Sequence, residues 1–304
     1  MAEGLCSGRV VVITGAGNGI GRAHALAFAA QGAKVVVNDL GGSRDGAGSS
    51  ADPAQTVVDE ITTVGGEAVA NTDDISSWAG AERLIRQAVD TFGGLDVVVN
   101  NAGILRDRMI VTMTEQDWDA VIAVHLKGTF AVLHHAAAYW RQRSKEGHAN
   151  DARVINTTSP SGLFGNAGQG NYGAAKAGIA SLTLIAAKEL DRYGVTVNAI
   201  APTALTRLTE DVPMMRDAAA ASELSPEAIS PLVVWLGSAE SRSVTGRVFG
   251  VWGNAITVLE GWVNGPSVSR DSRWDPAALT AVVPDLVAKT APNADMLGTR
   301  KPVD

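Results

Sequence analysis

Apolar and polar positions alternate in a regular rhythm along most of the chain. Short runs rich in Val and Ile are separated by longer stretches in which apolar residues recur every three or four positions, a pattern that predicts strands and helices in alternation. The predicted strands are residues 10–14, 34–38, 67–70, 95–100, 153–157, 195–200 and 247–251. The predicted helices include residues 21–31, 53–64, 78–92, 115–141 and 171–193. Strands joined through helices run parallel and are covered on both faces, so we expect a doubly wound α/β sheet of seven parallel strands.

Three segments depart from this rhythm. Residues 41–52 are rich in Gly and Ser and predict a surface loop. Residues 203–225 carry no strand signal and are a candidate lid. No internal repeat and no linker divides the rest. We therefore predict one domain, residues 1–253, followed by a C-terminal extension, residues 254–304, that covers a pocket or packs on a neighbouring subunit.

Composition narrows the possible partners. The chain has 304 residues, of which 46% are hydrophobic and 19% charged, and a net charge of -7; this fits a folded protein without the positive field that nucleic acid requires. The single cysteine, Cys6, excludes an intrachain disulfide and a zinc site built on thiolates, and we predict no metal. No secretory leader and no run of about 18 apolar residues is evident. We expect a cytoplasmic protein with neither a nucleic-acid nor a membrane partner.

A glycine-rich loop follows the first predicted strand and leads directly into a helix. It reads TGAGNGIG, and its candidate cofactor-binding residues are Gly15, Gly17, Asn18, Gly19 and Ile20. Glycines permit the tight turn and let backbone N–H groups approach a pyrophosphate at the positive end of the helix. The strand-loop-helix context therefore favours a Rossmann-type domain that binds a dinucleotide.

Asp39 indicates which dinucleotide. It ends the second predicted strand, 24 residues beyond Gly15, near the spacing expected of an acid that bonds the adenosine ribose hydroxyls. A carboxylate there repels a 2′-phosphate, and neither Ala16 nor Asn18 supplies a compensating positive charge. These residues favour NAD over NADP. The alternative interpretation is that Asp39 is a solvated turn residue.

Tyr172 and Lys176 form a candidate catalytic pair. They lie four positions apart on a predicted helix, so their side chains share one face. An ammonium beside a phenol favours the phenolate and makes the tyrosine a better base. Thirteen residues earlier, Ser159 follows the fifth predicted strand, where its hydroxyl can bond a substrate carbonyl at the ligand-binding edge of the sheet.

Together these motifs resemble the short-chain dehydrogenase/reductase family. The glycine-rich loop, Asn100 to Gly103, Ser159, Tyr172 and Lys176 match the family in order and spacing over about residues 8–252. The resemblance implies interconversion of an alcohol and a ketone with a nicotinamide cofactor. In the mechanism that the resemblance implies, Tyr172 is the general acid and base, and Ser159 holds the carbonyl oxygen. Lys176 lowers the pKa of Tyr172 and binds the nicotinamide ribose.

The same resemblance implies further cofactor contacts. Asp74 and Ile75 match the family's adenine-binding pair. The further residues that match its cofactor-binding positions are Asn101, Ala102, Gly103 and Pro202, and Thr206 falls where a hydroxyl would reach the nicotinamide carboxamide. The family's usual Pro-Gly pair reads Pro202-Thr203 here, which changes the path of that loop.

His125 is a departure from the family pattern. It stands where most members have an Asn of the catalytic tetrad. That Asn relays protons to the lysine through water, and His125 is either a fourth catalytic residue with the same role or a residue that fills a kink in its helix.

A narrower resemblance concerns the substrate. The segments NDLGG, VNNAGILRD, HLKG and GNAGQGNY are similar to those in the dehydrogenase domains of peroxisomal multifunctional enzymes type 2, which implies oxidation of a (3R)-hydroxyacyl-CoA in fatty-acid or steroid side-chain breakdown. A 17β-hydroxysteroid or another apolar secondary alcohol is the alternative substrate. A non-catalytic NAD-binding module is an alternative of another class. The family also implies a homodimer or a homotetramer.

Overall fold

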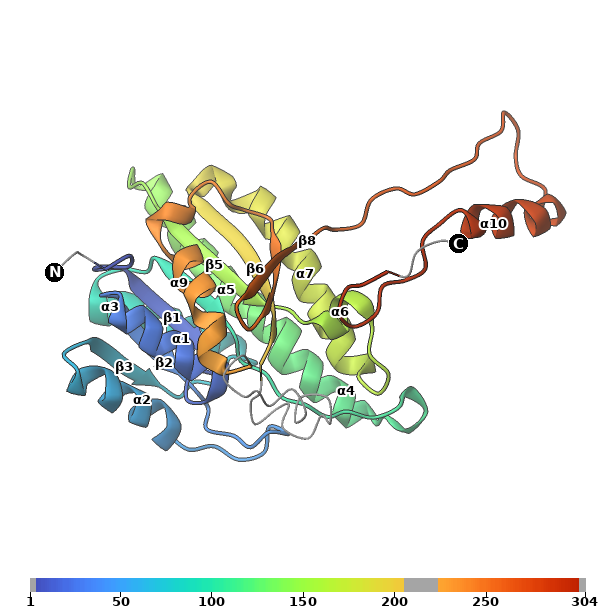
Figure 1. The fold of residues 1–304 in the computed structure, drawn as a ribbon. Helices are drawn as coiled ribbons and strands as arrows, with labels where there is room; N and C mark the ends of the chain where they lie inside the picture. The colour runs from blue at the N-terminus through green and yellow to red at the C-terminus, as the bar shows by residue number, and fades with distance from the viewer. Residues whose placement is uncertain (1–3, 205–223, 301–304) are drawn as a thin grey trace.

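The computed structural model describes residues 4–204 and 224–300. They form one eight-stranded sheet in the order β3-β2-β1-β4-β5-β6-β7-β8. The first seven strands pair in parallel. Their bounds are Val10–Thr14 (β1), Lys34–Asn38 (β2), Glu67–Asn71 (β3), Val97–Asn100 (β4), Ala152–Thr157 (β5), Val195–Thr203 (β6) and Val248–Trp252 (β7). The seven predicted parallel strands are confirmed (Figure 1).

The eighth strand corrects the predicted sheet. β8, Ala255–Leu259, lies in the segment assigned to the extension and pairs antiparallel with β7. The two strands form a hairpin around Gly253, whose φ of 52° suits glycine. β8 is an edge strand with exposed side chains, although four of the five residues in its sequence, AITVL, are apolar.

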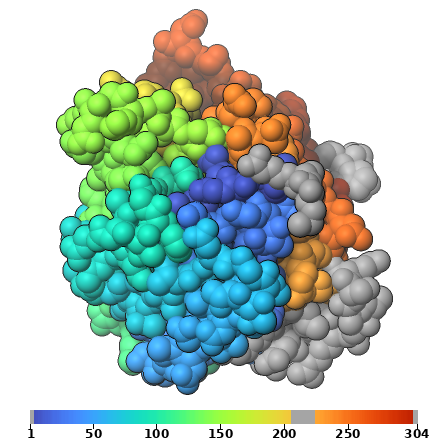
Figure 2. All heavy atoms as spheres, turned by 90° about the vertical axis from the view of Figure 1, so that its left-hand side faces the viewer, coloured from blue at the N-terminus to red at the C-terminus, as the bar shows by residue number. Residues whose placement is uncertain are grey.

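Helices cover both faces of the sheet. They are α1 (Gly19–Ala30), α2 (Asp52–Thr63), α3 (Trp78–Phe92), α4 (Glu115–Ile122), α5 (Gly128–Lys145), α6 (Pro160–Phe164), α7 (Gly170–Leu190), α9 (Ser230–Gly237) and α10 (Leu279–Ala288). One core cluster holds residues of α1, α2 and α9, and the other holds residues of α3, α5 and α7. The doubly wound α/β architecture follows, with the core on both sides of the sheet. Figure 2 looks onto the edge of the sheet at β3, where α2 and α3 form much of the surface.

The single helix predicted over residues 115–141 is wrong in detail. α4 and α5 are separated by a π-helical turn, Ala123–Lys127, which contains the buried His125. The whole stretch Glu115–Lys145 is long and apolar enough to cross a membrane by length and composition. Here one side of α5 packs in the core with α3 and α7, which is the arrangement of a core helix.

The C-terminal extension leaves the body after β8. Figure 1 shows it running outward to α10 and then back toward α6. Trp262 and Val263 on this path are exposed. On the return, Gly298 approaches the ring of Phe164 at the end of α6. The predicted lid, residues 203–225, falls almost wholly outside the described residues.

The packing of α1 can be tested through Phe28. This ring is fully buried and lies against Gly237 of α9, where an added Cβ would come within 2.5 Å of it. Phe28→Ala should lower the free energy of unfolding by about 3–5 kcal/mol because it leaves a cavity, as measured by denaturant titration. The exposed Trp262→Ala should change it by less than about 0.5 kcal/mol. Equal losses in the two variants would contradict this packing.

Candidate active site

The carboxyl edge of the sheet brings the candidate residues together. The glycine-rich loop leaves β1, the segment with Asn101 leaves β4, and Ser159 follows β5. These three strands are neighbours in the order β1-β4-β5. Because parallel strands end at the same edge, residues far apart in the sequence converge there.

The first contact is between the loops that follow β1 and β4. The Asn101 side-chain amide donates to the carbonyl oxygens of Thr14 and Gly15, at 3.0 and 3.1 Å. Gly15 has a φ of 63°, and a Cβ on it would lie 2.7 Å from the Cα of Ala102. A Cβ on Gly21 would lie 2.1 Å from the Gly15 carbonyl oxygen. Only glycine therefore allows the loops to meet, and Asn101 holds them together as well as lying in the site.

The start of α1 suits a pyrophosphate. Gly19 and Ile20 open the helix, and the residue before it, Asn18, makes no side-chain cap bond within the described residues. The first turn holds no acidic side chain. The first N–H groups of a helix lack intrahelical partners and carry partial positive charge. The glycine-rich loop therefore fits the diphosphate of a nicotinamide dinucleotide.

Asp39 lies against the glycine-rich loop. Its carboxylate accepts hydrogen bonds from the N–H groups of Gly17, at 2.8 Å, and Gly41, at 2.7 Å. A Cβ on Gly17 would lie 2.8 Å from the same carboxylate. The side chain is only partly exposed. It is thus part of the loop's structure and not a freely solvated turn residue.

Three further cofactor candidates lie at the carboxyl edge of the sheet, in different surroundings. Ile75 is buried in the core beside α3, and the exposed Asp74 accepts a hydrogen bond from the Ser76 N–H at 2.9 Å. Pro202 is near the end of β6, beside Val251 of β7. Thr206 lies outside the described residues.

Tyr172, Ser159 and Lys176 form one cluster. Tyr172 and Lys176 are on α7, and Ser159 caps α6 by accepting a hydrogen bond from the Ser161 N–H at 3.2 Å. The Ser159 hydroxyl lies close to the Tyr172 phenol and favours its ionisation. The Lys176 ammonium donates to the Thr157 carbonyl oxygen at 2.6 Å and lies 5.5 Å from the centre of the Tyr172 ring. The predicted serine, tyrosine and lysine thus meet.

The proton equilibrium of Tyr172 differs from the sequence-based expectation. Burial raises the pKa of Tyr172, the hydrogen bond with Ser159 opposes that rise, and the charge of Asp107 adds to it. Lys176 is not among the causes of this shift, and burial lowers the pKa of Lys176 itself to about 7. A lowering of the Tyr172 pKa by Lys176 stays a prediction.

His125 is a neutral, packed side chain in this site. Its ring lies 5.1 Å from the Tyr172 ring and nearly perpendicular to it. Its Nε2 is 3.0 Å from the Ile104 nitrogen and 2.8 Å from the Ile104 oxygen, so the tautomer decides which contact is a hydrogen bond. A Cβ on Gly103 would lie 2.3 Å from the ring. His125 thus fills the space under Gly103, while its role as a proton relay stays a prediction.

Sequence reasoning missed several residues that hold this cluster. The Thr158 hydroxyl donates to the Lys176 carbonyl oxygen at 2.6 Å, and the fully buried Asn171 bonds the Tyr172 N–H at 2.7 Å. Asn171 is adjacent to Tyr172 in the sequence, which is the one signal that pointed to it. Its partners on other elements become visible only in the fold.

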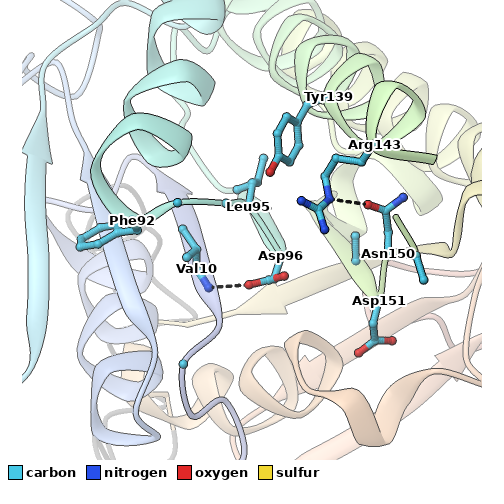
Figure 3. A pocket seen from close by; sticks show the side chains of 13 residues that line it. Val10, Phe92, Leu95, Asp96, Tyr139, Arg143, Asn150 and Asp151 are labelled. Carbon is cyan, nitrogen blue, oxygen red and sulfur yellow. Dashed lines mark hydrogen bonds between the residues drawn. The ribbon is translucent and has the colours of Figure 1, made fainter. Parts of the chain in front are cut away.

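Two pockets differ in their relation to the site. One, of about 530 Å³, adjoins the loop after β4 and is lined by Arg44, Asp45, Leu105, Arg106, Asp107, Arg108, Gln116 and Asp117. The other, of about 270 Å³, lies at the opposite edge, where β1, β4 and β5 begin. Figure 3 shows the latter, in which the Val10 N–H donates to Asp96 at 2.8 Å and Arg143 donates to Asn150 at 3.1 Å. It has no contact with the Tyr172 cluster.

The neutral state of His125 is testable by titration. Burial and, to a smaller extent, the charge of Lys176 lower the pKa of His125 to about 3, while the hydrogen bond with the Ile104 backbone opposes the shift. The NMR resonances of its ring should therefore not move between about pH 8 and pH 5, whereas those of the unfolded chain titrate near pH ~6.5. Because the unfolded state binds this proton first, protonation of His125 weakens stability as pH falls below that value. A His125 titration near neutral pH would contradict the described burial.

Comparison with known proteins supports the same assignment. The sequence model of the short chain dehydrogenase family matches residues 9–217. The chain is 46% identical over 308 residues to the hydroxyacyl-CoA dehydrogenase ChsB1 of Mycobacterium tuberculosis, covering 96% of this chain and 93% of that protein. It is 48% identical over 244 residues to the mouse peroxisomal multifunctional enzyme type 2, covering 80% of this chain but 31% of that protein.

A solved structure extends the comparison to the fold. A short chain dehydrogenase from Mycobacterium avium is 59% identical, with a TM-score of 0.87 and coverage of 96% of this chain and 98% of that chain. The family typically uses NAD or NADP. The protein therefore belongs to the short-chain dehydrogenase family and is an oxidoreductase similar to the dehydrogenase domain of the multifunctional enzymes.

Proposed function

We propose that the protein oxidises a (3R)-hydroxyacyl-CoA to the 3-ketoacyl-CoA with NAD, in the breakdown of fatty acids or steroid side chains. The observation that carries the reaction type is the cluster in which the Tyr172 phenol has the buried Lys176 ammonium 5.5 Å from its ring centre and the Ser159 hydroxyl close by. The substrate class is supported by similarity to a hydroxyacyl-CoA dehydrogenase over nearly the whole length of both proteins.

Each side chain has a definite task in this proposal. The Ser159 hydroxyl orients the substrate oxygen, and the Tyr172 phenolate takes the hydroxyl proton. A nicotinamide bound at this edge would supply the acceptor for the hydride from the carbon that bears the hydroxyl. Oxidation needs the Tyr172 phenolate, which becomes more abundant as pH rises. Because burial raises the pKa of Tyr172, a higher pH is needed to form it. In the reverse direction the neutral phenol returns the proton to the carbonyl oxygen, so low pH favours reduction.

The cofactor would be held by the elements of the carboxyl edge. The N-terminus of α1 would bind the pyrophosphate, and Asp39 the adenosine ribose. Asp74 and Ile75 would lie on the adenine side, and Lys176 would bond the nicotinamide ribose.

Other substrates and roles remain alternatives. A 17β-hydroxysteroid or another apolar secondary alcohol would use the same proton chemistry. The exposed apolar residues Met109 and Ile110 lie beside Gly168 and Gly170, just before Tyr172, and such a surface suits either apolar substrate. A non-catalytic NAD-binding module would not require the Ser159–Tyr172 pair.

We also propose a homodimer or homotetramer in the cytoplasm. Phe130 on α5 and Leu184 and Ile185 on α7 are exposed apolar side chains, and burial against a second copy would remove them from water. The location is supported by Cys6, a buried free thiol, which is typical of a reducing compartment.

The substrate class can be tested with a matched panel. The purified protein should form NADH with (3R)-hydroxyacyl-CoA thioesters at a kcat/KM at least about tenfold, or ~1.4 kcal/mol, above that for the (3S) enantiomers, 17β-hydroxysteroids and simple secondary alcohols. Absorbance of NADH at equal substrate concentrations is the measurement. Rapid oxidation of free steroids with inert thioesters would refute the acyl-CoA assignment and leave the proton chemistry in place.

Cofactor choice can be tested at Asp39. We expect the wild type to prefer NAD over NADP by at least about tenfold in kcat/KM, roughly 1.4 kcal/mol. Asp39→Ala removes the carboxylate that would repel a 2′-phosphate, so the ratio should shrink. An unchanged ratio in a variant with normal stability would show that Asp39 does not select the cofactor.

A further inference from the structure

Asn171 is a fully buried polar residue whose side chain is saturated with hydrogen bonds. Its Nδ2 donates to the carbonyl oxygens of Arg106, at 3.0 Å, and Asp117, at 3.1 Å. Its Oδ1 accepts from the Tyr172 N–H at 2.7 Å. Two donors and one acceptor are thus engaged in a place without access to solvent. Each bond ends on a backbone group of a different element.

The hydrogen bond to Tyr172 gives an acceptor to a backbone N–H that has none within the helix. Tyr172 is the third residue of α7, and the residue before the helix, Gln169, makes no side-chain cap bond within the described residues. The first N–H groups of a helix have no intrahelical acceptor. Asn171 therefore caps α7 from inside its first turn, at the backbone of the tyrosine that bonds Ser159.

The other two bonds fix that turn to the rest of the site. Arg106 is in the loop after β4, and Asp117 is in α4. The same loop is joined to the segment before α7 by the Arg108 N–H, which donates to the Gly168 oxygen at 2.8 Å. The position of Tyr172 is thus set by α4 and the loop after β4 as well as by α7.

We propose that Asn171 is a positioning residue for Tyr172, holding the first turn of α7 where the phenol meets the Ser159 hydroxyl. This inference rests on the proposed function, in which Tyr172 transfers the proton. Alanine at position 171 would remove the acceptor of the Tyr172 N–H and the amide donor of the Arg106 carbonyl in a buried place, while the Asp117 carbonyl would keep only the bond of its own helix. Aspartate would keep the acceptor for Tyr172 but turn an oxygen toward the two carbonyls in place of the amide donors.

The test compares Asn171→Ala and Asn171→Asp with a matched control, Asn198→Asp. Asn198 is also buried and bridges two backbone groups, the Val244 oxygen at 2.8 Å and the Arg247 N–H at 3.0 Å. It lies in β6, and its bonds within the described part of the chain do not reach α7. The control therefore reproduces the loss of a buried amide without touching Tyr172.

We expect both Asn171 variants to lower kcat by about 100-fold, the cost of a small misplacement of a reacting group, with unchanged KM and NADH affinity. The acid limb of the pH profile for oxidation should move to higher pH, because a displaced Tyr172 moves away from the Ser159 hydroxyl, which favours its ionisation, while the Asp107 charge, which opposes ionisation, remains. Asn198→Asp should lower stability but keep the kcat and pH profile of the wild type. If Asn171 acts through Tyr172, adding Asn171→Ala to Tyr172→Phe should cause no further loss.

A readout that needs no turnover separates this proposal from the proposed function. The ionisation of Tyr172 is followed as the near-ultraviolet absorbance titration of each protein minus that of its Tyr172→Phe counterpart. The midpoint pH of this difference titration should be higher than in the wild type for Asn171→Ala and unchanged for Asn198→Asp. No shift, or a kcat loss equal to that of the control, would overturn the positioning role. Failure of the wild type to oxidise any substrate of the panel would refute the proposed function, while the titration would still decide the role of Asn171.

Discussion

The structure depends on the close approach of two loops at the carboxyl edge of the sheet. β1 and β4 are parallel neighbours, and the chain leaves them toward opposite faces, since α1 packs in one core cluster and α5 in the other. In doubly wound folds, the ligand-binding crevice forms where two neighbouring strands are followed by connections on opposite faces of the sheet. The loops can meet because Gly15 leaves room for Ala102 and because Asn101 bonds the backbone of the loop after β1.

Burial of polar groups then determines the chemistry available in that crevice. Lys176 and His125 are buried and Tyr172 is partly buried, and each therefore favours its neutral form. Their remaining partners are mainly backbone groups: Lys176 bonds the Thr157 oxygen, and Asn171 fixes the N–H of Tyr172. A phenol held in this way, with a serine hydroxyl beside it, can exchange one proton with a substrate oxygen while the hydride leaves the adjacent carbon.

The sequence was sufficient wherever local pattern and fold agree. The seven parallel strands follow from their apolar runs, and Ser159, Tyr172 and Lys176 were found from spacing and motif. β8 was missed although four of its five residues are apolar, because only two residues separate it from β7 and the alternation of strands and helices does not predict a hairpin there. The break at Ala123–Lys127 was foreseen only as one of two interpretations of His125, because it accompanies the packing of His125 under Gly103, a tertiary contact. The pKa of Tyr172 cannot be judged from spacing, because spacing places Lys176 beside it but does not report the burial that raises the pKa of Tyr172 and lowers that of Lys176.

The central claim is that this edge of the sheet is a catalytic site with Tyr172 as its proton-transfer group. The most direct measurement is turnover and NADH binding in parallel for the wild type and Tyr172→Phe, which differ by one hydroxyl. The account predicts that the variant binds NADH with the affinity of the wild type but loses nearly all alcohol oxidation across the whole pH range. Equal turnover by the two proteins would contradict the claim.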